Sequence, residues 1–358
     1  MRVLVIGSGS GAMASAVELS LAGHEVRLVG RSEATMAPLR ANGIGYKGVL
    51  GEGRTGAMVI DTAMAPHAGW AEAAVVSLPT FAHSGIARAM AQAGWNAARP
   101  VVLNPGHTGG ALEFATAFKA QVGVAPCVAE FATLAYVARK YLPDEVTVTG
   151  RAKFLRAAAL PGGDEALHTA LALFPGSHDA GDVLATGLAN VNMVLHPPGS
   201  VMAAAWVEAR QGDFTFYVDA MTPGVARVMA KLDGERRRVA AAFGHDLPPL
   251  VAEMQRIGTA SANADATDLR AAISGGEANA RIRAPDALTH RYYTEDFGFG
   301  LVPFVALAGV ARVGVPTAAA LLALGHAMQP GVGGAGRDAA AMGIAGLNRA
   351  DLLRHVRR

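Results

Sequence analysis

Three polar residues in the second half of the chain have the types and the setting of a proton-transfer and carboxylate-binding site. His196 lies in ANVNMVLHPPGS, one helical turn after Asn192 and directly before two prolines that are expected to end or kink its helix. An imidazole at a helix end can reach into a cleft and exchange a proton near neutral pH. In THRYYTEDFGFGLVP, Asp296 could orient that imidazole and Arg291 could bind a substrate carboxylate through two hydrogen bonds. We therefore expect acid–base chemistry on a carboxylate-bearing substrate, with Asn192 beside it.

A glycine-rich turn near the start of the chain indicates a dinucleotide site. The segment RVLVIGSGSGA reads as an apolar strand that runs into a turn and then a helix. Gly7 would permit the tight turn, Gly9 would let backbone amides approach a pyrophosphate, and Ala12 would let the helix pack closely on the strand. Ser10 and Gly11, at the start of the helix, would direct N–H groups at the phosphate.

The end of the second expected strand, HEVRLVGRS, favours NADP over NAD. In NAD-binding sheets a carboxylate about 20 residues after the glycines accepts hydrogen bonds from the ribose 2′-hydroxyl. Arg31 and Ser32 stand in that region instead, and both can donate hydrogen bonds to a 2′-phosphate. We therefore expect NADPH to be preferred over NADH.

Two further loops are expected to face the cofactor, because the cleft of a doubly wound sheet opens at the carboxyl ends of its strands. SLPTFAH contains Leu78 and Pro79, and LNPGHTGGALEF contains Asn104, His107 and Thr108. We expect Leu78, Pro79 and Asn104 to contact the cofactor. His107 and Thr108 are expected to contact the substrate. Glycine and proline clusters also form ordinary turns, which is the alternative for the second loop.

The order of strand-like and helix-like segments predicts an α/β protein with two domains. Strand-like runs occupy residues 3–6, 26–29, 58–60, 74–78, 101–104 and 127–131, with helical stretches between several of them, and two more follow at 146–150 and 154–160. Such alternation is typical of a parallel sheet. From about Asp182 the pattern is helical, and one helix is marked by Thr222 as N-cap, Pro223 as first residue and Gly244 after its end. We predict a Rossmann-type dinucleotide-binding domain over residues 1–180 and an all-helical substrate domain over residues 181–358.

The composition excludes several classes of protein. Of 358 residues, 51% are hydrophobic and 17% charged, so the chain is not disordered, and the net charge of +2 with no long basic stripe argues against a nucleic-acid partner. Cys127 is the single cysteine, which excludes an internal disulfide; with no leader evident, we expect a cytoplasmic protein without a metal site. Residues 301–324, which include Arg312 and two prolines, are expected to form two buried helices rather than a membrane span, and residues 330–336 a flexible loop. Apolar helices could also be buried in a homodimer.

The glycine turn and four further segments resemble the opine dehydrogenases over nearly the whole chain: EFATLAYVAR, NVNMVLHPPG, FYVDAMTPGVARVMAKLDGERRRVAAAFG and RYYTEDFGFGLVP. The resemblance implies reductive condensation of an amino acid or amine with a 2-oxo acid such as pyruvate, with a nicotinamide cofactor as reductant. It also implies that His196 and Asp296 are catalytic, that Arg291 binds the oxo acid, and that Glu130 lies near the amino donor. The chain departs from the family at Phe131, where a small polar residue is expected, and at Ala135, where proline is usual. Phe131 would make the donor pocket more apolar.

Two other functions remain open from the sequence. A ketone reductase of the ketopantoate reductase type would combine the same kinds of domain, but it relies on a lysine in its second domain. The only lysine after residue 153 is Lys231, in a segment that reads as a charged outer face, so only a histidine-based keto-acid reductase remains. A regulator that binds NADP without turnover would be expected to lack the residues that transfer protons, whereas His196, Asp296 and Arg291 are all present.

Overall fold

The computed structural model describes residues 1–275, 279, 281–329 and 336–358, and these residues cluster into two units. Unit 1 comprises Met1–Gly106, Gly110–Thr186 and His355–Arg358; unit 2 comprises His107–Gly109 and Gly187–Arg354. The boundary expected after residue 180 thus lies before the observed one, which falls within helix α7 (Val183–Leu188). The loop expected at residues 330–336 lies, apart from Gly336, outside the described residues.

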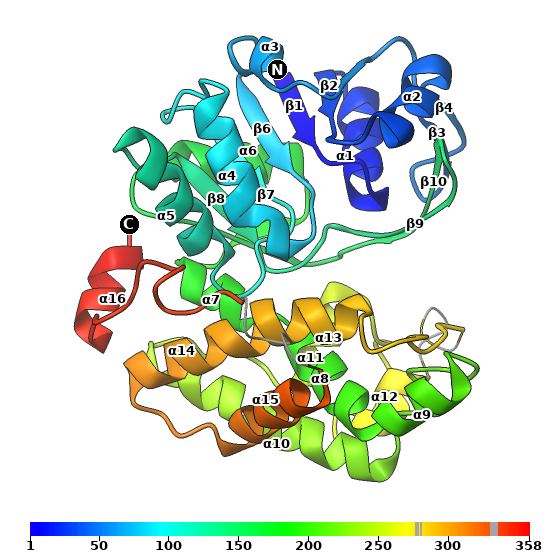
Figure 1. Cartoon of the computed structure of the whole chain (residues 1–358), viewed down its shortest axis with the longest axis vertical. Coiled ribbons are helices and arrows are strands. Elements are labelled where there is room, and N and C mark those ends of the chain that lie inside the picture. The colour runs from blue at the N-terminus through cyan, green and yellow to red at the C-terminus, as the bar shows by residue number, and fades with distance from the viewer. Residues whose placement is uncertain (276–278, 280, 330–335) are drawn as a thin grey trace. The chain divides into compact units, whose positions relative to one another are not determined.

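Unit 1 is built on an eight-stranded sheet with the strand order β12-β11-β8-β7-β6-β1-β2-β5 (Figure 1). Neighbouring strands are parallel except β8 and β11, which are antiparallel. The predicted parallel sheet is therefore confirmed, although β12 was not predicted. The strands are β1 (Arg2–Ile6), β2 (Glu25–Val29), β5 (Val59–Asp61), β6 (Ala73–Val76), β7 (Val101–Leu103), β8 (Val128–Phe131), β11 (Leu155–Ala159) and β12 (Ser177–Asp179).

Alternate residues of these strands supply the core of unit 1. Val3 and Val5 of β1 join one hydrophobic cluster with residues of α1 (Ser10–Leu21), α2 (Glu33–Asn42) and α6 (Asp164–Leu173). Leu4 and Ile6 are also buried, on the opposite face, as expected for a parallel sheet covered on both sides. The remaining helices of the unit are α3 (Ala65–Ala68), the 3₁₀ turn η1 (Thr80–Ala82), α4 (His83–Gln92) and α5 (Gly110–Val122), of which α4 and α5 pack against each other.

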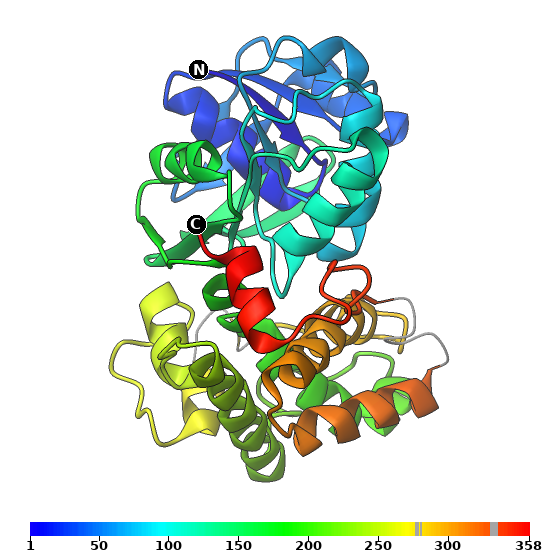
Figure 2. The same cartoon turned by 90° about the vertical axis from the view of Figure 1, so that its left-hand side faces the viewer.

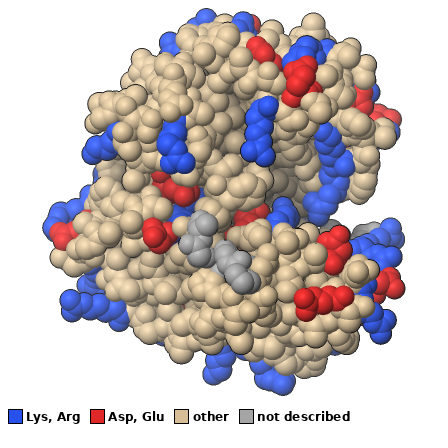
Figure 3. Space-filling view, viewed as in Figure 1, with Lys and Arg blue, Asp and Glu red and all other residues tan. Residues whose placement is uncertain are grey.

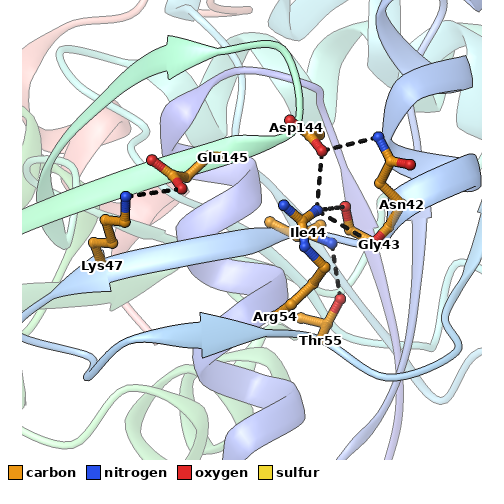
Figure 4. Close-up of polar contacts among 8 residues, drawn as sticks. All are labelled: Asn42, Gly43, Ile44, Lys47, Arg54, Thr55, Asp144 and Glu145. Atoms are coloured by element: carbon orange, nitrogen blue, oxygen red, sulfur yellow. Dashed lines mark hydrogen bonds and ion pairs between the residues drawn. The ribbon is translucent and has the colours of Figure 1, made fainter.

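A second, smaller sheet lies against α1 and has the order β4-β3-β10-β9. Its strands are β3 (Gly45–Gly48), β4 (Gly53–Arg54), β9 (Tyr136–Leu142) and β10 (Glu145–Arg151), of which only β10 was predicted. Asp144, between β9 and β10, accepts hydrogen bonds from Asn42 Nδ2 and Arg54 Nη1, each at 3.0 Å, and Lys47 pairs with Glu145 (Figure 4). Such exposed pairs add little stability, but they join segments that are distant in sequence.

In its described residues, unit 2 consists of helices and loops (Figure 2), with one isolated β-bridge between Thr215 and Arg283. The predicted all-helical second half is therefore confirmed. The helices are α8 (Asn192–Met202), α9 (Ala204–Arg210), α10 (Pro223–Ala242), α11 (Leu250–Ile257), α12 (Leu269–Ser274), α13 (Arg291–Asp296), the π-helical turn η2 (Phe297–Leu301), α14 (Val302–Ala311), α15 (Pro316–Met328) and α16 (Arg349–Val356).

Helix α10 has the predicted ends and forms the centre of unit 2. The Thr222 side chain accepts a hydrogen bond from the Val225 N–H, Pro223 is the first residue, and Gly244 follows the end with a φ of 90°. The fully buried Arg236 of α10 pairs with Asp233 at 2.7 Å and donates to the carbonyls of Leu188 and Pro248. These bonds join α10 to the last residue of α7 and to the loop that precedes α11.

The apolar stretch at residues 301–324 forms two helices, as predicted, but α15 is buried on one face only: Leu321 is buried and Leu324 is 48% exposed. The continuous run Arg291–Ala311 is 21 residues long and is long and apolar enough to cross a membrane, judged by length and composition alone. Half of its apolar window is buried inside the protein. On the face drawn in Figure 3, basic side chains stand in separate groups, with acidic side chains among them.

Candidate active site

His196 lies inside helix α8 and not at its end, which corrects the expectation drawn from the two prolines. The helix continues through Pro197 and Pro198 to Met202. Each proline removes one N–H donor from the helix, but residues 193–200 are buried. At Gly199 a Cβ would come within 2.9 Å of the Phe216 ring, so tertiary packing holds α8 helical against its local preference.

The structure brings His196 and Asp296 into direct contact. His196 Nδ1 and Asp296 Oδ2 are 2.7 Å apart, and the two residues are 3% and 8% exposed. Asp296 ends α13 and is followed by the π-helical turn η2, a form that occurs often at functional sites. Within this turn Gly300 permits a close approach to α8, because a Cβ there would lie 3.3 Å from the Met193 side chain. A carboxylate in this position fixes the imidazole tautomer with its proton on Nδ1.

Aromatic side chains enclose the His196 imidazole. The Tyr292 ring stacks on it with centroids 3.9 Å apart and planes 18° apart, and Phe216 meets it edge-on at 6.1 Å. The Tyr217 hydroxyl lies 2.6 Å from His196 Nε2 and 3.4 Å from the Tyr292 hydroxyl. Sequence reasoning missed Tyr217 as a site residue, since no spacing or charge pattern marks it; only its place in the family-like segment FYVDAMTPG singles out its neighbourhood.

Arg291 is the first residue of α13 and Asp296 is its last, and the Arg291 side chain is exposed. Its guanidinium carbon lies 5.8 Å from the centroid of the Tyr292 ring, the ring that stacks on His196. Partial desolvation of the guanidinium lowers the pKa of Arg291, but the nearby Glu295, Asp296, Tyr292 and Tyr217 together raise this pKa by more, so Arg291 stays charged. A carboxylate bound to Arg291 would therefore be held close to the imidazole.

His107 belongs to unit 2 and reaches the same cluster of charges. It has a φ of 58°, which is uncommon for a residue other than glycine or asparagine, and it is 9% exposed. One side-chain hydrogen bond joins it to Asn190, and its Nδ1 is buried without a partner among the described residues. Burial lowers its pKa to about 4; Asp296 opposes this shift, and Arg337 and Arg291 add to it. His107 is therefore a neutral imidazole at neutral pH.

We expect His107 to make the protein sensitive to acid. Between pH 6.5 and about 4 the unfolded chain binds a proton at this residue that the folded chain does not, so stability falls as the pH falls. The whole effect is on the order of 3 kcal/mol. In His107→Asn, whose side chain tolerates a positive φ, thermal unfolding followed from pH 7.5 to 4 should show a smaller loss of stability than the wild type. Parallel curves for the two proteins would contradict this prediction.

Thr108 and Asn192, both predicted to contact the substrate, differ in their burial and in their hydrogen bonds within the protein. Thr108 is fully buried; its hydroxyl donates to the Gly187 carbonyl at 3.0 Å and accepts from Asn190 Nδ2 at 3.2 Å, while Arg337 donates to its carbonyl at 2.6 Å. Its side chain thus anchors a loop. Asn192 is half-buried at the start of α8, on the same helix face as His196, where a substrate contact remains a prediction.

Phe131 and Glu130, which were predicted to line the substrate pocket, are both fully buried in this structure. Adjacent residues of a strand point to opposite faces of a sheet, and Phe131 joins the core of unit 1, with its ring 5.1 Å from that of Phe174. Glu130 is also fully buried, and its carboxylate accepts hydrogen bonds from the Ala111 N–H at 2.7 Å and the Thr186 hydroxyl at 2.6 Å. In this structure Glu130 secures the start of α5.

In unit 1 the glycine turn has the geometry that a pyrophosphate requires. Gly7 has a φ of 137°, and a Cβ there would lie 2.4 Å from the Ser77 carbonyl oxygen and 3.0 Å from the Ala12 Cβ. Gly9 is exposed, with open space beside it. It is the N-cap residue of α1, and no side chain caps the N-terminus of this helix. Ser10 and Gly11 stand in the first turn of α1, where backbone N–H groups lack helical partners. These residues fit a dinucleotide phosphate.

The other residues expected at the cofactor fall into two groups. Arg31 is exposed directly after β2 and Ser32 is half-buried as the N-cap of α2, while Leu78 is half-buried and Pro79 exposed after β6. Asn104 differs: it is fully buried, donates to Ser15 Oγ at 3.3 Å and accepts from the Ala135 N–H at 3.0 Å. Its side chain therefore joins the loop after β7 to α1 within unit 1.

Comparison with known proteins places these features in a family. Residues 179–329 match the family model described as the NAD/NADP octopine/nopaline dehydrogenase alpha-helical domain. The chain is 30% identical to an opine dehydrogenase from Arthrobacter sp. (strain 1C) over 256 residues, which are 71% of this chain and 70% of that protein. It is 26% identical to vitopine synthase from Allorhizobium ampelinum over 47% of this chain and 46% of that protein.

Solved structures share the fold. The structure of octopine dehydrogenase with NADH and L-arginine has a TM-score of 0.79 at 20% identity and covers 99% of this chain and 98% of its own. A ketopantoate reductase from Ralstonia eutropha is more distant, with a TM-score of 0.60 at 19% identity, covering 92% of this chain and 98% of its own. The extent of the match to the Arthrobacter enzyme decides the assignment: the chain belongs to the opine dehydrogenase family and is an NAD(P)-dependent oxidoreductase.

Proposed function

We propose that this protein is an NADPH-dependent opine dehydrogenase, which condenses the amino group of an amino acid or amine with a 2-oxo acid such as pyruvate and reduces the resulting imine. The observation that carries the proposal is the buried pair of His196 and Asp296, with Arg291 at the other end of the same short helix, α13, as Asp296. A proton-exchanging imidazole and a carboxylate-binding guanidinium are the two groups that condensation with an oxo acid requires.

The names of related structures support both substrate classes. Octopine dehydrogenase has been solved with NADH and L-arginine, with NADH and agmatine, and with NADH and pyruvate. L-Arginine and agmatine both carry a primary amine, and pyruvate is a 2-oxo acid. We propose that this chain takes one substrate from each of these chemical classes.

The residues of the chain would act in sequence. Arg291 binds the carboxylate of the oxo acid and so places its carbonyl near the imidazole. His196 accepts a proton from the ammonium group of the second substrate, which frees the amine for attack on the carbonyl. Asp296 keeps the Nδ1 proton in place and stabilises the imidazolium that forms. His196 then returns the proton to the departing hydroxyl group. Bound NADPH supplies the hydride that reduces the imine.

NADPH is proposed over NADH because Arg31 and Ser32 follow β2. Relatives of this fold have been solved with either cofactor: yersinopine dehydrogenase with NADP+ and octopine dehydrogenase with NADH. In Arg31→Asp we expect kcat/KM for NADPH to fall about 10- to 100-fold, the loss of one charge-assisted contact to a phosphate, and the value for NADH to rise. Steady-state kinetics with each cofactor measure both changes.

The matched control for this variant is Arg88→Asp, which makes the same change of charge at an exposed position on α4. It should leave the ratio of the two cofactors unchanged. An Arg31→Asp protein that keeps the wild-type ratio of NADPH to NADH activity would remove the basis for the cofactor preference.

The proposed reaction is tested by following NADPH oxidation with pyruvate or glyoxylate alone, with a pool of amino acids and amines alone, and with both together. Oxidation that requires both substrates supports reductive condensation, and separating the pool then identifies the amine. Product mass should equal the sum of the two substrates, minus water, plus two hydrogens. Oxidation with the oxo acid alone at an undiminished rate would argue for a ketone reductase.

The ketone reductase is the second candidate, favoured by the fold shared with ketopantoate reductase. His196 and Arg291 could serve the reduction of a 2-oxo acid without any amine. A lysine mechanism has no support, because Lys231 is exposed on α10 and is the only lysine after residue 153.

A further inference from the structure

Both ring nitrogens of His196 are already engaged. Asp296 Oδ2 lies 2.7 Å from Nδ1 and the Tyr217 hydroxyl lies 2.6 Å from Nε2. A carboxylate can only accept, so Nδ1 carries a proton and donates it to Asp296. In the neutral imidazole Nε2 is then the acceptor, and the Tyr217 O–H donates to it. The lone pair that general-base chemistry requires therefore points at Tyr217.

The rest of the imidazole is covered as well. Tyr292 lies on one face of the ring at 3.9 Å, Phe216 stands edge-on to it, and His196 as a whole is only 3% exposed. A substrate proton can reach Nε2 in this arrangement only through the Tyr217 hydroxyl. The alternative is that the substrate displaces Tyr217 and contacts Nε2 itself.

We propose that Tyr217 is a catalytic residue: its hydroxyl touches the substrate and relays protons between the substrate and His196. This inference rests on the proposed function and assigns to Tyr217 the contact that a histidine acting alone would make. The Arg291 guanidinium carbon lies 5.8 Å from the centroid of the Tyr292 ring, and the Tyr217 hydroxyl lies 3.4 Å from the Tyr292 hydroxyl, so the group proposed to hold the oxo acid and the hydroxyl that would serve it stand beside the same side chain.

The relay moves two protons in one step, because a free tyrosinate is not accessible. Burial raises the pKa of Tyr217 well above its usual value of 10, Tyr292 and Asp296 raise it further, and Arg291 opposes them only in part. Tyr217 therefore gives its proton to Nε2 while its oxygen takes one from the substrate. When the imidazolium forms, Nε2–H donates to the Tyr217 oxygen, and the Tyr217 proton can turn toward the substrate or the Tyr292 hydroxyl.

The proton balance of the reaction closes through this relay. The ammonium group of the amine loses one proton through Tyr217 to His196, leaving a neutral amine and an imidazolium. The amine attacks the carbonyl carbon, and one proton moves from the new ammonium nitrogen to the alkoxide oxygen, which gives a neutral carbinolamine. The imidazolium proton then returns through Tyr217 to the hydroxyl oxygen, the C–O bond breaks, water leaves, and the nitrogen lone pair forms the C=N bond of a cationic iminium. His196 ends neutral, as it began, ready for the next turnover.

Tyr217→Phe tests the relay, since it removes the hydroxyl but keeps the ring. Loss of a positioned proton-transfer group should lower kcat about 100-fold, with the KM for the oxo acid within about threefold of wild type because Arg291 is untouched. The matched control is Tyr293→Phe, which removes another buried hydroxyl, one that donates to the Ser200 carbonyl at 2.9 Å. That variant should stay within about threefold of wild type in kcat.

A proton relay through Tyr217 and displacement of Tyr217 by the substrate predict opposite effects of Tyr217→Phe on kcat. If the substrate displaces Tyr217, Tyr217→Phe frees Nε2 and its kcat should equal or exceed that of the wild type, which would overturn the relay. A fall in kcat no larger than that of Tyr293→Phe would overturn it too. Should Tyr217→Phe not fold, the solvent isotope effect on wild-type kcat decides: a relay moves two protons together and gives a curved dependence on the D₂O fraction, whereas a straight line contradicts it.

The wild-type assay separates failure of the relay from failure of the proposed function. If NADPH oxidation needs only the oxo acid, reductive condensation is excluded, but the relay is still testable because a reduced ketone also takes up a proton. If both substrates are needed and Tyr217→Phe keeps its full rate, condensation stands and the relay falls.

Discussion

Replacing His196 with alanine should reduce turnover about 1,000- to 10,000-fold while NADPH still binds, the range expected for loss of a general acid–base group. An imidazole can both take and give a proton near neutral pH, and this one contacts both Asp296 and Tyr217. Its contacts to Asp296 and Tyr217 lie within unit 2, whereas the residues that fit the pyrophosphate lie in unit 1. The steady-state rate of NADPH oxidation measures turnover, and fluorescence titration measures NADPH binding.

Two companion variants sharpen this prediction. Asp296→Asn keeps the shape of the pair but can donate to Nδ1, which would turn the imidazole to the wrong tautomer, so its loss of kcat should approach that of His196→Ala. His326→Ala removes an exposed histidine from α15 and should be neutral. Undiminished turnover in His196→Ala would remove His196 from the mechanism.

The second large effect is expected at the glycine turn. There, alanine at Gly9 should weaken NADPH binding, whereas alanine at Gly7 should lower the stability of the fold. Gly9 has ordinary backbone angles (φ −81°, ψ 177°) and open space around it, so Gly9→Ala should fold with nearly wild-type stability. Its methyl group would occupy space that the pyrophosphate needs, and we expect NADPH affinity to fall about 100-fold. Thermal unfolding and NADPH titration of the same preparation measure the two properties.

Gly7→Ala should instead lose stability. Its φ of 137° is closed to alanine, and the methyl group would meet the Ser77 carbonyl oxygen at 2.4 Å. Backbone strain and overpacking together suggest a loss of about 2–5 kcal/mol in the free energy of unfolding. If Gly7→Ala unfolds like the wild type, or if Gly9→Ala unfolds early, the distinction drawn between the two positions is wrong.

Sequence reasoning succeeded where local rules decide the structure. The β1–turn–α1 unit and the ends of α10 depend on neighbouring residues, such as Gly7 beside Ala12 and Thr222 beside Val225. Strand β3 was missed because it pairs with β10, about 100 residues further along the chain, and short polar runs such as GYKG carry no local strand pattern. Non-local pairing supplies their stability.

The site shows the same limit. His196, Asp296 and Arg291 could be chosen from their chemistry and the family resemblance, but their contact spans 100 residues and only the fold reveals it. The end of α8 was misplaced because proline rules describe an isolated helix, whereas this one is held by packing. Strand alternation places the Phe131 and Glu130 side chains on opposite faces of the sheet, so a shared role in one pocket is not expected from the local pattern.

The division of the chain has a consequence for recombination between relatives. Three residues, His107–Gly109, belong to unit 2 although the sequence on both sides belongs to unit 1. Within unit 2 the Thr108 hydroxyl binds the Gly187 carbonyl, and Arg337 binds the Thr108 carbonyl. A hybrid gene that exchanges only the continuous segment 187–354 would therefore join a loop from one parent to its anchors from the other. The structural unit is discontinuous in sequence. A functional chimeric enzyme would therefore need His107–Gly109 and residues 187–354 from the same parent.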